Sequence, residues 1–219
     1  GRRVEPLPKR VIHKTLGCNL VAQMPHYIEQ QGPVLTLTLA RPDKKNALSS
    51  AMYLQLVQAL RDAEAASDIH VIVLRGQPDC FCAGNDLADF VAAGALNAEH
   101  PTVMFLHQLS QCPKPVIAAV NGLALAGGLE TVLCCDLVIA AQSARFGDAH
   151  SNFGVFPGGG GAAVLPRKIP ENVAKYMLFT GDALPAQDMK NYGLVSEVVA
   201  DETERRNRPR LWVCKSSEF

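Results

Sequence analysis

Residues 114–130 read KPVIAAVNGLALAGGLE and carry the strongest structural signal in the chain. The apolar run over 116–120 predicts a buried strand, the small residues after it predict a tight turn, and a helix is expected over 128–135. The first N–H groups of a helix lack partners within it and lie at the positive end of its dipole. The N–H of Gly127 can therefore stabilise negative charge on a carbonyl oxygen, and the alternative is an ordinary glycine turn.

A second turn of small residues lies earlier, at residues 81–87, which read FCAGNDL. It follows a buried strand and precedes an amphipathic segment, and its small side chains would let the backbone approach a ligand closely. Taken alone, this turn has a plain alternative, a strand-to-helix connection in which Asp86 caps the helix. The pairing of the two turns is what favours a ligand site.

Strand-like and helix-like segments alternate around these turns. Residues 34–39 alternate leucine with threonine, which is the period of a half-buried strand. Ser49 can cap a helix whose apolar positions recur at helical spacing, at Leu54, Val57, Leu60 and Ala63. Further strands are expected at 69–74, 137–141 and 195–199, and further helices at 173–179 and 186–192. The alternation predicts an α/β fold with buried strands.

The composition indicates one globular domain that handles a small ligand. The 219 residues are 48% hydrophobic and 19% charged, which is enough for one substantial core. Lys plus Arg and Asp plus Glu each total 21, so no net field favours nucleic acid or a membrane surface as a partner. No apolar run approaches the roughly 18 to 20 residues of a membrane span, and the N-terminus lacks an apolar signal sequence. We expect a soluble protein of the cytoplasm.

The cysteines also indicate a reducing compartment. There are seven, an odd number that includes the adjacent Cys134 and Cys135, which is not the pattern of a secreted disulfide scaffold. Cys80 and Cys82 lack a second His or Cys pair at a zinc-ligand spacing. We therefore expect buried free thiols and no metal site.

The two ends of the chain lack regular patterning. Residues 1–23 carry five Lys or Arg against one acid, and we expect them to form an N-terminal extension outside the fold, with Met24 as the original start. A mitochondrial transit peptide is the alternative. Residues 201–219 hold the only Trp and are expected to form an atypical tail. The predicted domain is 24–200.

The turns at 81–87 and 114–130 resemble, in order, the two signatures of the crotonase family, which includes enoyl-CoA hydratases and isomerases. The resemblance implies a spiral of repeated β-β-α units, with the family's usual C-terminal helical region truncated or replaced. It also implies an oxyanion hole in which the N–H groups of Ala83 and Gly127 bind the thioester oxygen of an acyl-CoA. Residues 41–48 (RPDKKNAL) are similar to the family's early CoA-contacting loop, and residues 146–147 with 157–161 resemble its later active-site loop.

The resemblance also assigns residues to the CoA and substrate contacts. They are Lys44, Lys45, Ala47, Ala83, Gly84, Asn85, Asp86 and Gly127. For the two lysines the alternative is a solvated loop. CoA would be part of the substrate, so no separate cofactor is expected. The family further implies a homo-trimer or a dimer of trimers, an assembly that its C-terminal region helps to build.

Two side chains are candidates for proton transfer. Glu130 lies three residues after Gly127, on the first turn of the same expected helix, and matches the first catalytic glutamate of the hydratases. Twenty residues later, where hydratases have their second catalytic glutamate, this chain has His150. A histidine can orient water or exchange a proton near neutral pH, and the alternative is a polar residue that only lines the pocket. Asp148 either bonds a neighbour or, as we expect, is exposed.

The activity implied by the resemblance is that of an enoyl-CoA hydratase/isomerase-like enzyme, as in fatty acid metabolism. It would act on an acyl-CoA thioester through an enolate that the oxyanion hole stabilises. Other reactions of the family are the alternatives within it: decarboxylation, hydration coupled to cleavage, or thioester hydrolysis. The alternative of a different class is a protein that binds acyl-CoA without catalysis.

Overall fold

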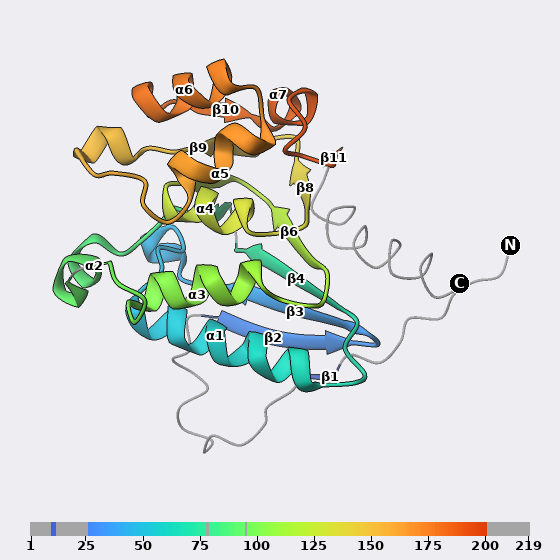
Figure 1. Ribbon diagram of the computed structural model, residues 1–219. Coiled ribbons are helices and arrows are strands. Elements are labelled where there is room, and N and C mark those ends of the chain that lie inside the picture. The colour runs from blue at the N-terminus through green and yellow to red at the C-terminus, as the bar shows by residue number, and fades with distance from the viewer. Residues whose placement is uncertain (1–9, 12–25, 78, 95, 201–219) are drawn as a thin grey trace, which may run out of the picture.

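A computed structural model describes residues 10–11, 26–77, 79–94 and 96–200 (Figure 1). The predicted tail at 201–219 lies outside the described residues, as does most of the predicted extension at 1–23. Within that extension, β1 (Arg10–Val11) pairs antiparallel with β2 (His26–Gln31). The expectation that the whole extension stands outside the fold is therefore wrong for these two residues.

The larger sheet has seven strands in the order β1-β2-β3-β4-β6-β8-β11. Beyond the first two strands, its members are β3 (Val34–Leu39), β4 (Val71–Gly76), β6 (Val116–Val120), β8 (Leu137–Ala141) and β11 (Glu197–Val199). The β1, β2 and β3 strands are antiparallel, and from β3 onward each neighbouring pair is parallel. Parallel strands are typically covered on both faces, which explains the continuous apolar runs in β4, β6 and β8.

The smaller sheet has four strands in the order β10-β9-β7-β5. They are β5 (Cys80–Cys82), β7 (Leu123–Leu125), β9 (Arg145–Gly147) and β10 (Ala183–Pro185). Strands β5, β7 and β9 are parallel, with Cys82 opposite Ala124 and Leu125 opposite Gly147. Their carboxyl ends consequently meet at one edge of this sheet, and none of the four was predicted from the sequence because each has only three residues.

Seven α-helices and two short 3-10 helices connect the strands within the described ranges. They are α1 (Ser50–Ala65), α2 (Leu87–Ala93), α3 (Pro101–Ser110), α4 (Gly127–Leu133), α5 (Gly161–Lys168), α6 (Glu171–Thr180), α7 (Ala186–Asn191), η2 (Pro42–Lys44) and η3 (His150–Phe153). Helices α1 and α3 pack side by side across one face of the larger sheet (Figure 1). In the part of the chain that the structure describes, no helix is long and apolar enough to cross a membrane.

The predicted cap of α1 is confirmed, but its buried face is rotated from the predicted one. The Ser49 hydroxyl accepts the Met52 N–H at 3.4 Å. Val57, Leu60 and Ala63 are buried as expected. Leu54 is 46% exposed, because the face that meets α3 and the sheet runs instead through Met52, Tyr53, Leu56, Val57 and Leu60.

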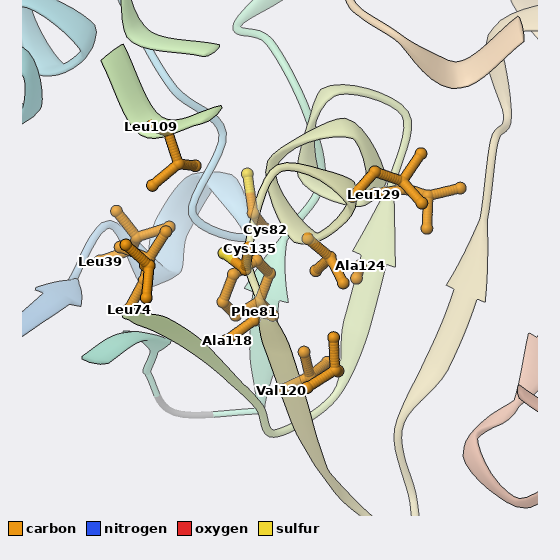
Figure 2. Close-up of a cluster of buried hydrophobic side chains, with 14 of the residues drawn as sticks. Leu39, Leu74, Phe81, Cys82, Leu109, Ala118, Val120, Ala124, Leu129 and Cys135 are labelled. Carbon is orange, nitrogen blue, oxygen red and sulfur yellow. The ribbon is translucent and has the colours of Figure 1, made fainter. Parts of the chain in front are cut away.

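One large apolar core joins both sheets to the helices between them. Phe81 in β5 is fully buried and belongs to the cluster that Figure 2 draws, together with Ala118 of β6 and Cys135. Leu39, Leu74 and Val120 contribute from the larger sheet. The core therefore fixes the short strands of the small sheet against the larger one, and the predicted α/β architecture is confirmed.

Candidate active site

The carboxyl edge of the small sheet brings the predicted site residues together. Strand β5 is followed by residues 83–86, β7 by Ala126 and Gly127 at the start of α4, and β9 by residues 148–150. Because the three strands are parallel neighbours, these segments emerge side by side. Ligands of α/β sheets bind outside the carboxyl ends of the strands, which is where these candidates lie.

A cavity of about 410 Å³ opens at this edge, within the size range of small-molecule sites. Of the predicted residues, it is lined by Lys44, Ala47, Ala83, Asn85, Asp86, Glu130 and His150. Lys45, Gly84 and Gly127 are not among the lining residues. Most of the remaining wall is apolar and comes from Leu87, Phe90, Leu96, Val103, Phe153, Val155 and Phe156. The cavity thus combines an apolar wall with a few polar groups at one end.

The early loop is held against the site by Asn46, which is fully buried and has a φ of 57°. Its Oδ1 accepts the Arg41 N–H at 2.8 Å, and its Nδ2 donates to the carbonyls of Gln77 and Cys80, both at 2.7 Å. Asparagine tolerates the left-handed backbone better than most residues, so one side chain supplies both the turn and its anchor. Lys44, two residues earlier, is exposed and lines the cavity.

Asp86 serves as the helix cap that the sequence offered as an alternative. Its Oδ1 accepts the Asp89 N–H at 3.4 Å at the start of α2. Its Oδ2 lies 2.8 Å from Nη1 of Arg41, and this hydrogen bond lowers the pKa of Asp86. The ion pair ties the early loop to the second turn, and Asp86 lines the cavity as well.

The N–H of Ala83 is not available as an oxyanion donor in this structure. It donates instead to the carbonyl of Lys45 at 3.0 Å, in the early loop. The assignment of Ala83 as one of the paired donors is therefore corrected. The sequence could not show this, because the hydrogen bond joins segments 38 residues apart by their numbering, 45 and 83.

The peptide between Gly84 and Asn85 offers a better-oriented donor. The Gly84 carbonyl accepts the Leu48 N–H at 2.8 Å, from the early loop. In a trans peptide the C=O and N–H point in opposite directions, so the Asn85 N–H points away from that loop. The nitrogen of Gly127 lies close to this peptide, 3.2 Å from where a Cβ on Gly84 would stand. The N–H groups of Asn85 and Gly127 are thus the candidate pair of donors.

Glu130 is 2% exposed and lies on the first turn of α4. Its Oε1 accepts the Gly161 N–H at 3.0 Å, and a side chain on Gly159 would collide with its Oε2. Burial raises the pKa of Glu130; the Gly161 hydrogen bond and the charge of His150 oppose that rise, and Asp148 adds to it. A carboxyl group with a raised pKa beside an apolar cavity is suited to proton transfer near neutral pH.

Asp148 and His150 form a buried pair close to Glu130. The Nδ1 of His150 lies 2.9 Å from Oδ1 of Asp148, which also accepts the His150 backbone N–H at 3.3 Å. Asp148 is fully buried, so the expectation that it is exposed was wrong. Burial lowers the pKa of His150, but the hydrogen bond and charge of Asp148, followed by the charge of Glu130, raise it above its ordinary value.

Two polar residues of the site were missed by the sequence reasoning. The Tyr53 hydroxyl donates to Oδ1 of Asn85 at 2.5 Å, and the Thr102 hydroxyl donates to the same oxygen at 3.4 Å. Tyr53 is one of the buried residues of α1, and Thr102 lies in the first turn of α3. Neither position carries a sequence signal of its own, because what makes them polar partners is the approach of α1 and α3 to the Asn85 turn.

The described cysteines are free, at positions 80, 82, 112, 134 and 135. Burial raises the pKa of Cys80 to about 11 and that of Cys82 to about 12. Their thiols are therefore protonated at neutral pH and pack in the core. Among the residues that the structure describes, no group of three or more His, Cys, Asp or Glu could hold a metal ion.

The fold and the site together define a class of protein: an α/β spiral in which a helix start, a buried carboxyl group and a buried imidazole lie at one largely apolar cavity. A sequence profile described as enoyl-CoA hydratase/isomerase matches residues 29–213, and the chain belongs to this family. This is the crotonase family, whose signatures the turns at 81–87 and 114–130 resemble.

Known proteins of the family resemble the chain closely. It is 40% identical over 174 residues to the 2,3-dehydroadipyl-CoA hydratase of Escherichia coli K12, covering 78% of this chain and 68% of that protein. It is 36% identical to the 1,2-epoxyphenylacetyl-CoA isomerase of the same organism, again covering 78% and 68%. A crystal structure of an enoyl-CoA hydratase from Mycobacterium tuberculosis H37Rv superposes with a TM-score of 0.78 at 40% identity, covering 88% of this chain and 81% of that one. The chain spans between 58% and 69% of the length of the curated relatives it matches.

Proposed function

We propose that this protein is an enoyl-CoA hydratase/isomerase-type enzyme that acts on an acyl-CoA thioester. The observation that carries the proposal is the arrangement on the first turn of α4. The N–H of Gly127 begins the helix, and the Glu130 carboxyl group stands on the same face, three residues later, beside the apolar cavity. One element thus presents an oxyanion donor and an acid/base group to the same acyl chain.

The thioester is polarised by the N–H groups of Asn85 and Gly127. Electron density drawn onto the thioester oxygen gives the acyl group enolate character, and removing one such donor from an enzyme typically costs about 3 to 4 kcal/mol in the transition state. The support for this pair is the direction of the Asn85 N–H and the closeness of Gly84 to the nitrogen of Gly127. Ala83 then lines the cavity and does not donate a hydrogen bond to the thioester oxygen.

The proton transfers fall to Glu130 and His150. In hydration of a 2-enoyl thioester, Glu130 takes a proton from water as the hydroxyl oxygen bonds to the β-carbon, and the resulting enolate receives a proton at the α-carbon. In isomerisation, the same carboxylate moves a proton along the chain without adding water. Both side chains line the cavity and are buried, which strengthens their electrostatic effect.

In this proposal, CoA is the part of the substrate that carries the acyl group. Lys44 is the cation at the rim of the cavity and is suited to the phosphates, and Ala47 and Asp86 lie beside it. Lys45 does not line the cavity; its carbonyl instead holds the Ala83 N–H, so it contributes through its backbone.

The test is turnover of a short 2-enoyl-CoA by the purified 219-residue chain, followed as loss of absorbance by the conjugated thioester. We expect activity in the wild type and a loss of about 100-fold to 10,000-fold in Glu130→Gln, which keeps the size of the side chain and its acceptor for the Gly161 N–H. The matched control is Glu171→Gln on the exposed face of α6, where the carboxylate forms an ion pair with Lys175. Equal turnover in Glu130→Gln would remove this residue as the acid/base. Absence of turnover in all three proteins, with CoA-thioester binding by calorimetry, would replace the enzyme with a binder.

We also propose a homo-trimer or dimer of trimers in the cytoplasm. The support for assembly is a set of large apolar side chains on the surface: Val91, Phe156 and Phe179 are each at least 75% exposed. Sedimentation of the purified chain tests the assembly, and a monomer across the accessible concentration range would contradict it.

A further inference from the structure

The buried Asp148 carboxylate has almost no partner other than His150. It follows β9 directly and is fully buried, and its Oδ1 accepts both the backbone N–H and Nδ1 of His150. Its Oδ2 has no hydrogen-bond donor within the described residues. An ionised carboxylate in such a place is costly unless a positive charge stands beside it. Among the residues that the structure describes, the group in position to supply that charge is the imidazole of His150.

The backbone around this pair is shaped to hold the ring in place. Ala149, between the two residues, has a φ of 59°, which is uncommon for a residue with a side chain. The resulting turn starts η3 and carries the His150 ring back over Asp148. Gly161 lies against the far side of the carboxylate, and a Cβ there would stand 2.5 Å from Oδ2 of Asp148. Three segments therefore fix the carboxylate, and the carboxylate fixes the ring.

The orientation of the ring determines which nitrogen faces the substrate. Because Nδ1 lies against a carboxylate acceptor, it carries a hydrogen in either charge state. His150 lines the cavity and its Nδ1 is engaged by Asp148, so Nε2 is the nitrogen left for a bound acyl chain. When the ring is charged, Nε2 carries a hydrogen as well and becomes a proton donor.

The charges around His150 are few. Asp148 and Glu130 act on it directly. Helix α6, which packs against η3, bears the exposed ion pair of Glu171 with Lys175, and its Tyr176 donates to Asp182, which follows the helix and is also exposed. Lys44 and Asp86 also line the cavity, and Asp86 is paired with Arg41. Of the charged groups that the structure describes, two buried carboxyl groups thus act on the imidazole, which favours its charged form.

We propose that Asp148 is a positioning residue that holds His150 as an imidazolium with its Nε2–H directed into the cavity, which makes His150 the proton donor and Glu130 the base. This inference rests on the proposed function. In the hydration step, water loses a proton to Glu130 and its oxygen bonds to the β-carbon. The electron pair of the resulting enolate then takes the Nε2 proton to form the α-carbon C–H bond, which leaves a neutral imidazole. Transfer of the Glu130 proton back to His150 restores both groups, and the net change is the addition of one water.

The first test needs no turnover. Long-range ¹H–¹⁵N NMR spectra of the full chain, with His150→Gln to assign the signals, report both the tautomer and the titration of the ring. We expect the wild-type ring to be charged at pH 7 and, once deprotonated, to keep its hydrogen on Nδ1. In Asp148→Asn the titration should move down by about 1 to 3 pH units, the usual effect of losing an adjacent opposite charge. A wild-type ring that is neutral at pH 7, or that carries its hydrogen on Nε2, overturns the proposal even if Asp148→Asn does not fold.

The second test asks whether Asp148 acts through the ring. The alkaline limb of the kcat profile for a short 2-enoyl-CoA should move to lower pH in Asp148→Asn, and the shift should vanish in the His150→Gln background. Asp182→Asn makes the same chemical change at an exposed carboxylate and should leave the profile unmoved. A kcat that falls equally at all pH values, or an Asp148→Asn effect that persists without His150, would assign Asp148 a structural role only. If the wild type has no activity, the proposed function fails while the NMR titration still decides the role of Asp148.

Discussion

The carboxylate of Glu130 accepts the backbone N–H of Gly161 at 3.0 Å, so the acid on α4 is oriented by the first residue of α5. Gly161 also lies against Asp148, where its missing Cβ makes room for Oδ2. The same glycine therefore contacts both carboxyl groups that act on His150. The run of four glycines after Pro157, which resembles the family's active-site loop, has a physical role here: it lets the backbone approach two buried carboxyl groups.

Gly161→Ala should damage the site and the fold together. The new methyl group would stand 2.5 Å from Oδ2 of Asp148 and 2.9 Å from Cβ of Pro157, so the loop or the Asp148 carboxylate, and with it the His150 ring, must move, whereas Oε1 of Glu130 at 3.4 Å stays at ordinary contact distance. We expect a loss of about 1 to 3 kcal/mol in the free energy of unfolding, as for other overpacked interiors. Turnover should fall by about 100-fold, since a displacement of about 1 Å at a reacting group has that effect. Urea denaturation and the 2-enoyl-CoA assay measure the two quantities.

The control for this substitution lies three residues earlier. At Gly158 an added Cβ would meet only Leu96 at 3.5 Å and Phe156 at 3.9 Å, which are ordinary contacts. Gly158→Ala should therefore change stability by less than about 0.5 kcal/mol. Equal damage from both substitutions would mean that the loop needs glycine for flexibility and not for the close approach to Asp148 and Glu130.

Glu130 should make stability depend on pH in a direction opposite to that of most carboxylates. Because burial raises its pKa, the folded state holds the proton more tightly than the unfolded chain does. Its contribution to stability is complete below the unfolded pKa of about 4.3 and is lost as the pH rises through the folded pKa. Urea denaturation between about pH 4.5 and pH 8 should show the free energy of unfolding falling with pH more steeply in the protein with Glu130 than in Glu130→Gln.

The pKa of His150 is also raised, so its contribution has the same sign and must be separated. Both proteins are therefore measured in the His150→Gln background. Parallel curves for Glu130 and Glu130→Gln in that background would show that the carboxyl group has the same pKa folded and unfolded, contrary to the burial argument.

The fold was predictable where local chemistry and burial agree. Strands β3, β6 and β8 were predicted with their observed bounds because each is an uninterrupted or alternating apolar run. The small sheet was not predicted, since a strand of three residues has no measurable period and is held in place by its neighbours. The prediction that Leu54 belongs to the buried face was wrong for a related reason. Helical spacing defines a face, but which residues of that face meet the core depends on how α1 packs against the rest of the protein.

The site was predictable in outline and not in hydrogen bonding. The motifs gave Glu130, His150 and the Gly127 helix start, and all three lie at one edge of the small sheet. They could not show that the Ala83 N–H is used by Lys45, because that bond depends on a distant loop. Asp148 was within reach of sequence reasoning: a carboxylate two residues before a histidine can fold back onto its ring, although its complete burial could not be foreseen.

Asn46 should be among the polar residues most important for stability. Its side chain satisfies the Arg41 N–H and the carbonyls of Gln77 and Cys80, and its backbone is left-handed. Asn46→Ala would leave buried groups without partners, at about 1 to 3 kcal/mol, and would add about 1 to 2 kcal/mol of backbone strain. Asn46→Gly removes the same hydrogen bonds without the strain, so the difference between the two variants in urea denaturation isolates the backbone contribution. Asn191→Ala, at an exposed amide on α7 that bonds Gln187, is the control. If Asn46→Ala and Asn46→Gly are equally stable, the left-handed backbone at this position is not strained by a side chain.

Ala126 offers the opposite prediction, a substitution that stabilises. It caps the start of α4 with a φ of 48° and a ψ of −120°, a conformation that costs a residue with a Cβ about 1 to 2 kcal/mol. Its N–H donates to the Gly147 carbonyl at 3.0 Å, so the backbone must hold this shape to join β9 to the start of the helix. Ala126→Gly should therefore raise the free energy of unfolding by about 1 kcal/mol, after the greater flexibility of glycine in the unfolded chain is subtracted.

Ala124→Gly, two residues earlier in β7 and fully buried, makes the same chemical change in an extended strand and should lower the free energy of unfolding by about 0.5 to 1 kcal/mol. Urea denaturation of the two variants should thus give shifts of opposite sign. Two losses of similar size would show that the Ala126 turn, which carries Gly127 and Glu130 into the cavity, is relaxed with its methyl group in place.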